Sequence, residues 1–247
     1  MFHGRSRFVR MAAAAAAAAA YLGCLATGAQ ASTASGASNG RDPLAGQSAT
    51  EVSIEALANL KAASSLTMAG TLYDSGTKFT LDLGLKPGHG CAGTLGMGSK
   101  GSFKLVVIGK TVYFNPDKQF WESAGGANAA AVIALVHGRY IKTSTSDKDI
   151  AAVATLCNIS TAIGSVKVTG SFTKGALTTL HGVRVLPLEN SSGVIDVTDT
   201  SKPEVVAIIG PKGTATGDGA LTFSVGAQVT LAAPPASQVI NGAQLGL

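Results

Sequence analysis

The sequence predicts a single domain of the α+β class, built around an antiparallel sheet. Of the 247 residues, 46 % are hydrophobic and 13 % are charged, a balance that argues against disorder in most of the chain. Aromatic residues are scarce at 5 % while Gly is abundant at 31 residues, which suits short strands with Gly-rich turns. Apolar residues alternate with a period of two in two stretches of chain, separated by short helical patterns. Such consecutive runs of strands favour antiparallel pairing, and no repeat of fixed period occurs.

The first residues have the layout of a secretory signal. Arg5, Arg7 and Arg10 precede the Ala-rich apolar run of residues 11–20, and a basic start before a short apolar run is typical of such signals. The run is too short and too rich in Ala for a membrane span. Without these three arginines, 16 basic residues face 14 acidic ones. No basic cluster interleaved with aromatic residues indicates a nucleic-acid partner.

Two processing routes are open. Residues 29–31, Ala-Gln-Ala, fit the A-x-A site after which a signal peptidase cleaves, which would leave a secreted chain after Ala31. Residues 21–24, Tyr-Leu-Gly-Cys, resemble a lipobox, in which Cys24 becomes the acylated first residue. Gly23 fits the lipobox pattern, whereas Tyr21 stands where the pattern favours Leu.

The cysteine count favours lipidation. Three Cys are an odd number for an exported chain, and if Cys91 and Cys157 pair, the one left over is Cys24 at the end of the apolar run. Their disulfide would close a loop of about 66 residues, worth roughly 4 kcal/mol in the chain-entropy model. We therefore expect residues 1–23 to be a signal peptide and Cys24 to be lipidated.

Residues 24–47 are expected to form a flexible tether, and residues 48–247 the single domain. The tether is rich in Ser, Ala, Gly and Thr, a composition that cannot bury a core. Within it, residues 36–40 match the G-x-S-x-G pattern of hydrolases. That motif needs a strand before it and a helix after it, and neither pattern is present.

The domain is expected to open with a helix and to continue as hairpins. Residues 48–51, Ser-Ala-Thr-Glu, form a capping box that begins a helix through about Ala63. A first hairpin follows at residues 66–85, turning at residues 74–76, and a second at residues 103–114, turning at Gly109 and Lys110.

Two short helices and a second run of strands are expected next. The helices are predicted at residues 127–136 and 147–156, the second capped by Ser146, with an extended piece at residues 138–143 between them. Strand patterns then occupy residues 166–172, 182–188, 193–198, 204–210 and 220–226. Residues 231–247 have no clear period.

Residues 88–93, Gly-His-Gly-Cys-Ala-Gly, match the G-x-G-x-x-G pattern of dinucleotide-binding loops. The match fails on context, because a strand pattern follows where a helix N-terminus would have to face the pyrophosphate. We expect these glycines to form a turn between strands, with Cys91 placed for a disulfide.

No catalytic, metal or cofactor site is indicated. The four His residues lie far apart, and His89, although close to Cys91, has no further ligand at metal spacing. Glu122, Asp147 and Asp149 could gather in a cleft, but nothing pairs them with a nucleophile, so helix capping and surface charge account for them. The sequence does not predict an enzyme.

Several short motifs point to a family. Residues 91–94, Cys-Ala-Gly-Thr, are followed by Gly101, by the strand pair of residues 105–114 and by residues 117–121, Asp-Lys-Gln-Phe-Trp. Residues 138–142, Gly-Arg-Tyr-Ile-Lys, and a short helix ending at Cys157 continue the pattern, with Tyr140 where Trp is frequent. Between residues 51 and 228 the chain thus resembles actinobacterial lipoproteins of the LppX/LprG type, within the LolA-like superfamily of lipoprotein and lipid carriers.

The resemblance implies a strongly curved antiparallel β-sheet, a half barrel, with short helices over its concave face. It implies acyl chains between sheet and helices, and a Cys91–Cys157 disulfide that ties a strand to the covering helices. Apolar residues at period two also pack in any sheet core, so the sequence does not separate a ligand lining from ordinary packing. The residues expected to face this space are Leu66, Met68, Phe79, Leu81, Leu83, Leu105, Val107, Phe114, Trp121, Val132 and Leu135.

Two hypotheses of function follow. The favoured one is a non-enzymatic lipoprotein on the outer face of the cell membrane, which binds or transfers a lipid or another hydrophobic ligand in the cell envelope. The alternative is an envelope interaction or sensor module with a filled core and no ligand, which contacts an envelope protein. A partly unfilled interior would favour the first, and a filled core with an exposed apolar patch the second.

Overall fold

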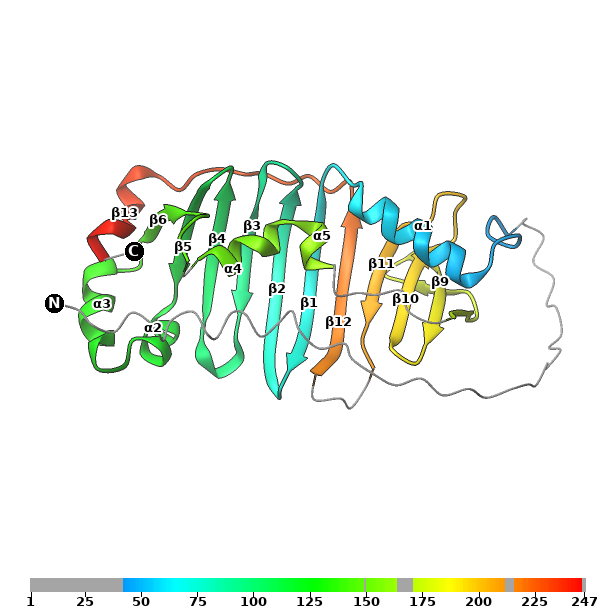
Figure 1. Ribbon diagram of the computed structural model, residues 1–247, viewed down its shortest axis with the longest axis horizontal. Helices are drawn as coiled ribbons and strands as arrows, with labels where there is room; N and C mark the ends of the chain where they lie inside the picture. Colours follow the sequence, from blue (N-terminus) through cyan, green and yellow to red (C-terminus); the bar gives the residue numbers. More distant parts are fainter. Residues whose placement is uncertain (1–41, 149, 164–170, 212–215, 246–247) are drawn as a thin grey trace.

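The computed structural model describes residues 42–245 except residues 149, 164–170 and 212–215. In this part of the chain, thirteen strands form one curved, unclosed sheet that extends along the long axis of the molecule (Figure 1). The first run contains β1 (Leu66–Asp74), β2 (Thr77–Lys86), β3 (Gly90–Gly96), β4 (Ser102–Ile108), β5 (Thr111–Pro116) and β6 (Tyr140–Ser144). The later strands are β7 (Thr173–Lys174), β8 (Thr178–Leu180), β9 (Val183–Asn190), β10 (Gly193–Thr198), β11 (Val205–Ile209), β12 (Thr216–Val225) and β13 (Val239–Asn241).

The two runs of strands meet in the middle of the sheet, where β1 pairs with β12. The strand order is β13-β6-β5-β4-β3-β2-β1-β12-β11-β10-β9-β7, with β8 paired to β9. Among the described strands, each pairing is antiparallel except that of β13, which lies parallel to β6 with Val239 opposite Tyr140. The expected α+β class and the curved antiparallel half barrel are confirmed.

Short helices lie across one face of this sheet, the concave face (Figure 1). One covers the β9–β12 end, two cross the middle strands and two stand at the β4–β6 end. In chain order they are α1 (Ala49–Lys61), α2 (Lys118–Ala124), α3 (Ala129–Val136), α4 (Ala151–Ala154) and α5 (Ile159–Ala162), with a 3₁₀ turn, η4 (Thr155–Cys157), between the last two.

The capping box at α1 is confirmed. The Ser48 hydroxyl accepts a hydrogen bond from the Glu51 N–H, and the Glu51 carboxylate accepts one from the Ser48 N–H at 2.7 Å. Val52, Ala56 and Leu60 recur at helical spacing and are buried in the core shared with the sheet. The cap therefore sets the start of α1, and this apolar stripe holds it over β9–β11.

The prediction of a turn at residues 88–93 was wrong in part. Gly88 and His89 do turn, but β3 begins at Gly90 and pairs with both β2 and β4. A Cβ at Gly93 would collide with the Asp82 carbonyl oxygen on β2, so this strand depends on a residue without a side chain. Glycines give no alternation of apolar and polar side chains, which is why the pattern concealed a strand.

The helices after β5 also differ from expectation. α2 was not predicted; it begins where Asp117 Oδ1 accepts a hydrogen bond from the Phe120 N–H at 2.7 Å. The helix predicted from residue 147 begins only at Ala151, and Ser146 does not cap it, because its hydroxyl pairs with that of Ser144. The strand expected at residues 166–172 falls mostly outside the described residues.

Two further segments belong to the folded body. Residues 226–238 connect β12 to β13 along the edge of the sheet that carries the β2–β3 and β4–β5 turns (Figure 1), where Val229 packs against Gly84, and we call them the strap. Leu44, which the sequence places in the tether, is only 1 % exposed, and its carbonyl oxygen accepts a hydrogen bond from Lys174 Nζ. The folded part thus reaches back at least to Leu44.

Candidate functional site

The concave face is organised in rows that run across the strands. Residues directly opposite each other in antiparallel strands point to the same face, so the pairing register defines each row. The upper row holds Val225, Leu66, Leu85, Cys91, Val107 and Val112. The middle row holds Phe223, Met68, Leu83, Gly93, Leu105, Phe114 and Ile141.

Most of the residues expected to face the interior lie in these two rows. Each member of the following group is at most 8 % exposed: Leu66, Met68, Leu83, Leu105, Val107, Phe114 and, from α2, Trp121. Phe79, Leu81 and Val132 are half-buried and pack against the same core. Leu135 is 52 % exposed and points away from it. The structure therefore gathers ten of the predicted residues around one core and leaves Leu135 outside.

A disulfide holds the cover over the upper row. Cys91 of β3 and Cys157 of η4 are bonded, with their Cα atoms 5.1 Å apart. Val153, Ile159 and Ile163 flank the bond and are buried against the sheet. The segment α4–η4–α5 is thus fixed at one point above the middle strands, as the resemblance implied.

Aromatic side chains close the core at the α2 end. The Phe120 ring lies 5.9 Å from Phe103, 5.6 Å from Phe114 and 5.6 Å from Trp121, each at a steep interplanar angle. Edge-to-face contacts of this kind stabilise a cluster beyond the area it buries. Phe103 and Phe120 were absent from the predicted set. The signal that could have found Phe120 is Asp117, an N-cap residue three positions before it.

The concave face is less covered toward the β1–β2 turn. Leu81 and Leu221 both stand opposite Gly70, Leu72 stands opposite Phe79, and Ile208 stands opposite Leu221. Neighbouring strands lie about 4.8 Å apart, so Leu81 and Leu221 are separated by about 10 Å with no side chain on Gly70 between them. All these apolar side chains are half-buried, and we call this set the open strip: Leu72, Phe79, Leu81, Ile208 and Leu221.

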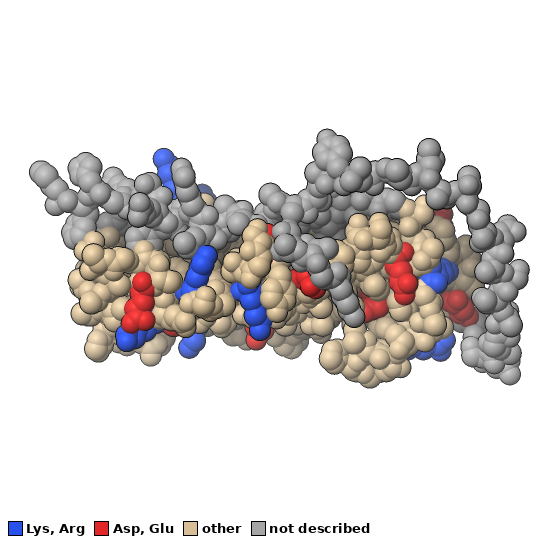
Figure 2. All heavy atoms as spheres, turned by 90° about the horizontal axis from the view of Figure 1, so that it is seen from below, with Lys and Arg blue, Asp and Glu red and all other residues tan. Residues whose placement is uncertain are grey.

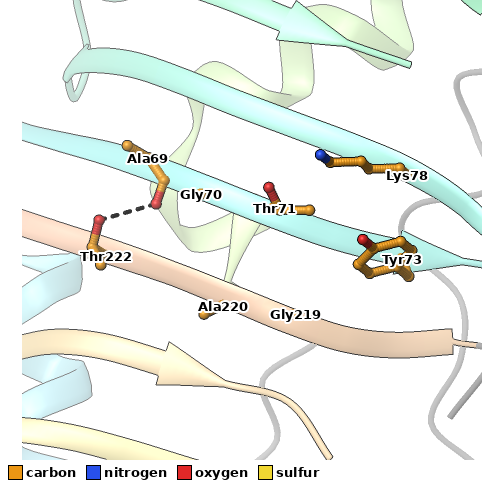
Figure 3. A pocket seen from close by; sticks show the side chains of 8 residues that line it. All are labelled: Ala69, Gly70, Thr71, Tyr73, Lys78, Gly219, Ala220 and Thr222. Carbon is orange, nitrogen blue, oxygen red and sulfur yellow. Dashed lines mark hydrogen bonds between the residues drawn. The ribbon is translucent and has the colours of Figure 1, made fainter. Parts of the chain in front are cut away.

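Two hollows mark the opposite, outer face in the described part of the chain. The first, of about 530 Å³, has a floor of Ala69, Gly219 and Ala220, and Tyr73 and Lys78 stand at its end (Figure 3). In it the Thr222 hydroxyl donates a hydrogen bond to the Ala69 carbonyl oxygen at 3.1 Å. The second, of about 400 Å³, lies between the strap and two hairpin turns and is lined by Lys86, Gly88, His89, Ile108, Gly109 and Leu231. Neither hollow is lined by a residue expected to face a ligand.

The titratable groups are dispersed. Glu122 forms an ion pair with Lys118 at 3.1 Å, and Asp147 accepts a hydrogen bond from Thr143, whereas Asp149 lies outside the described residues. Seen from below, acidic and basic side chains are interspersed with large uncharged areas (Figure 2). Within the residues that the structure describes, no three His, Cys, Asp or Glu side chains gather as metal ligands would. None of the described helices is long and apolar enough to cross a membrane.

One buried carboxyl group stands out. Asp196 of β10 is 7 % exposed, and burial, followed by the charge of nearby Glu189, raises its pKa above the usual value. Its register partners are Pro187 and Ala207, on the outer face of the sheet. Asp196 is therefore remote from the concave core and contributes nothing to a site there.

A comparison with protein-family models finds no match, and neither does a comparison with curated protein sequences. Among solved structures, LprF from Mycobacterium bovis is similar, with a TM-score of 0.52 and 15 % sequence identity, covering 75 % of this chain and 96 % of LprF. An uncharacterized conserved protein from Thermus thermophilus gives a TM-score of 0.34 at 10 % identity, covering 79 % of this chain and 99 % of that one. The similarity to LprF, over almost its whole length, shows that this chain has the LprF fold.

Proposed function

We propose that this chain is a non-enzymatic, exported lipoprotein that binds or transfers a lipid or another hydrophobic ligand in the cell envelope. The observation that carries the proposal is the open strip. Its side chains continue the apolar concave face but, unlike those of the upper and middle rows, they remain half-buried. Apolar surface of this kind, next to a position without a side chain, suits an acyl chain.

Binding would be driven by burial alone. Each CH₂ group that leaves water gains about 0.8 kcal/mol, and an acyl chain lying between Leu81 and Leu221 needs no polar partner. The disulfide at Cys91 holds the cover above the upper row, so the ligand would enter from the side of the β1–β2 turn. Deeper entry would require α4 and α5 to move around the fixed point at Cys157.

Two observations, one of fold and one of sequence motifs, support this function. The chain shares its fold with LprF, and its motifs around Cys91, Trp121 and Cys157 resemble those of LppX/LprG-type lipoproteins. Anchoring through an acylated Cys24, followed by the Ser- and Ala-rich tether, would hold the domain on the outer face of the cell membrane. Cleavage after Ala31, with secretion, is the other route.

A second function, an envelope interaction or sensor module without a ligand, is favoured by the tight core. Leu66, Leu83, Leu85 and Leu105 are fully buried among neighbouring side chains, and the two hollows lie on the outer face. In this case the open strip would contact an envelope protein instead of an acyl chain.

Native mass spectrometry of residues 32–247, purified without detergent, tests the proposal. Lipid binding predicts adducts that extract into organic solvent, and Leu81→Trp should remove them, because the larger indole would occupy the position beside Gly70 at which the acyl chain is proposed to lie. Ile54→Trp is the matched control, since Ile54 is an exposed aliphatic residue of α1 at 56 % exposure. Adduct-free protein, in the presence of added phospholipid too, would reject lipid binding and support the interaction module.

A further inference from the structure

A hollow at one edge of the sheet gathers basic groups but no acidic ones. It measures about 400 Å³, a size typical of small-molecule sites, and lies where the β2–β3 turn, the β4–β5 turn and the strap meet (Figure 1). Its lining residues are Lys86, Gly88, His89, Ile108, Gly109 and Leu231. Two of these side chains can carry a positive charge, and none can carry a negative one.

Two backbone hydrogen bonds fix the floor of this hollow. The His89 N–H donates to the Lys86 carbonyl oxygen at 2.9 Å, and Gly88 has a φ of 80°, as at the third position of a type II turn that begins with Lys86 and Pro87. The Gly109 N–H donates to the His89 carbonyl oxygen at 2.9 Å and so ties the second turn to the first. A type II turn does not use the N–H of its third residue, which leaves the Gly88 N–H as a donor for a ligand.

Lys86, the last residue of β2, has no anionic partner among the described residues. It is half-buried and lines the hollow, a position in which an ammonium group interacts more strongly with an anion than it would in open water. The ion pairs in the described part of the chain join Lys118 to Glu122 and Arg184 to Asp199, and no hydrogen bond of the Lys86 ammonium group is found there. An anion in the hollow would supply this partner.

His89 offers a second contact. Its Nδ1 atom lies 3.2 Å from the Pro87 carbonyl oxygen, and since a carbonyl oxygen only accepts, Nδ1 carries a proton in this contact and Nε2 is left for a ligand. When the ring takes up a second proton, Nε2 donates as well and the ring is a cation. Lys110, exposed in the β4–β5 turn, adds a third basic side chain at the same edge.

Carboxylate groups are remote from the hollow. No Asp or Glu occurs in the strap, in either turn or in the adjoining strand ends, residues 84–92, 106–112 and 226–238. Asp82, on the same face of β2, stands four residues before Lys86, about 13 Å away along the strand. The Asp147 carboxylate accepts a hydrogen bond from Thr143, which shares the concave face with Val112, whereas Lys86 points to the outer face.

We propose that this hollow binds a phosphate group, with Lys86 and His89 as its charged contacts. A phosphate group presents three acceptor oxygens and up to two negative charges, which the two side chains and the Gly88 N–H match in number, whereas a carboxylate has only two oxygens. Turns with free N–H groups recur as phosphate sites in proteins. Ile108 and Leu231 make the remaining wall apolar, which suits the carbon chain of a phosphate ester. The proposal does not depend on lipid binding, because the open strip lies on the concave face.

Titration of ¹⁵N-labelled residues 32–247 with inorganic phosphate, at constant ionic strength, tests the proposal through amide chemical shifts. We expect saturable shifts centred on Gly88, His89 and Gly109. Lys86→Gln should weaken the affinity for phosphate at least about tenfold, from the loss of one hydrogen bond between charged groups. Lys78→Gln is the matched control and should leave the affinity unchanged, since Lys78 also lies on the outer face of β2 but lines the other hollow.

Shifts that do not saturate, or that are equally large around Lys78, would overturn the proposal, and so would an unchanged affinity in Lys86→Gln. The first two results come from the wild-type chain, so they hold even if the variant folds poorly. Vesicles of phosphatidylglycerol and phosphatidylcholine identify the source of the phosphate. Sedimentation with these vesicles that Lys86→Gln reduces and Lys78→Gln does not would indicate a lipid headgroup, whereas saturable phosphate shifts without such sedimentation would indicate a free phosphate compound.

Discussion

Removal of the Cys91–Cys157 disulfide by the double substitution Cys91→Ala and Cys157→Ala should lower the free energy of unfolding by about 4 kcal/mol. The two residues are 66 positions apart, and the chain-entropy model gives that value for a closed loop of this size. Domains typically have only about 5–15 kcal/mol of stability in total. Loss of the bond should therefore move the unfolding midpoint strongly.

Equilibrium unfolding in urea, followed by the emission of Trp121, measures this change. Trp121 is the only Trp of the chain and is buried in the aromatic cluster, so its emission reports on the core. Wild-type protein treated with a reducing agent separates the two contributions. It loses the cross-link but keeps both sulfur atoms, whereas the double variant also loses buried volume at Cys91 and Cys157.

The reasoning fails if reduction lowers the free energy of unfolding by less than about 1 kcal/mol, far below the chain-entropy value. Such a result would mean that the unfolded chain already keeps β3 close to η4, so that the bond removes little entropy. The reducing agent should leave the unfolding of the double variant unchanged, which controls for effects of the reagent itself.

Two further predictions concern the outer face. The pKa of Asp196 is raised in the folded protein, so the folded state binds the proton more tightly than the unfolded chain does. The stability gained from this proton is therefore complete at pH values below the usual Asp pKa, and it is lost as the pH rises through the raised pKa of the folded state. Asp196→Asn should thus be more stable than wild type in urea at neutral pH and equal to it in acid; lower stability at neutral pH would contradict this. A Cβ at Gly84 would lie 3.0 Å from Val229 Cγ1, so Gly84→Val should destabilise by about 1–3 kcal/mol. In a double-mutant cycle, adding Val229→Ala should restore part of the free energy of unfolding lost in Gly84→Val. Purely additive changes in the free energy of unfolding would show that Val229 of the strap does not contact position 84 of β2 closely.

Short sequence motifs were sufficient to predict those elements whose geometry is determined by residues close together in the sequence. The capping box at Ser48 fixed the start of α1, and the two-residue turn at Gly109 and Lys110 fixed the register of β4 against β5. Period-two alternation correctly identified which side chains of β1, β2 and β4 face the concave core. These features depend on neighbours in sequence, so one sequence contains the information needed to predict them.

Other features depend on pairing that the sequence does not display. β3 is Gly-rich and shows no alternation, and the strap has no period because, up to the 3₁₀ turn at Ala236–Gln238, it belongs to no helix or strand. Leu135 was expected to face inward because α3 is apolar on every side, which leaves no polar face to orient it. Only the packing of Ile133 and Val136 against the core fixes its rotation.

The Cys91–Cys157 disulfide and Gly70 together explain why one part of the concave face is fully covered while another part is only half-buried. Cys91 lies in the upper row, so the covalent link holds the cover over side chains that are already fully buried, such as Leu85. Gly70 lies two residues beyond Met68 on β1, where the same face begins to lose its cover. A large side chain at Leu105 would therefore strain a filled core whether or not a ligand binds. Leu81 is only half-buried, so loss of ligand without loss of stability at Leu81 is the outcome that separates a lipid carrier from a filled interaction module.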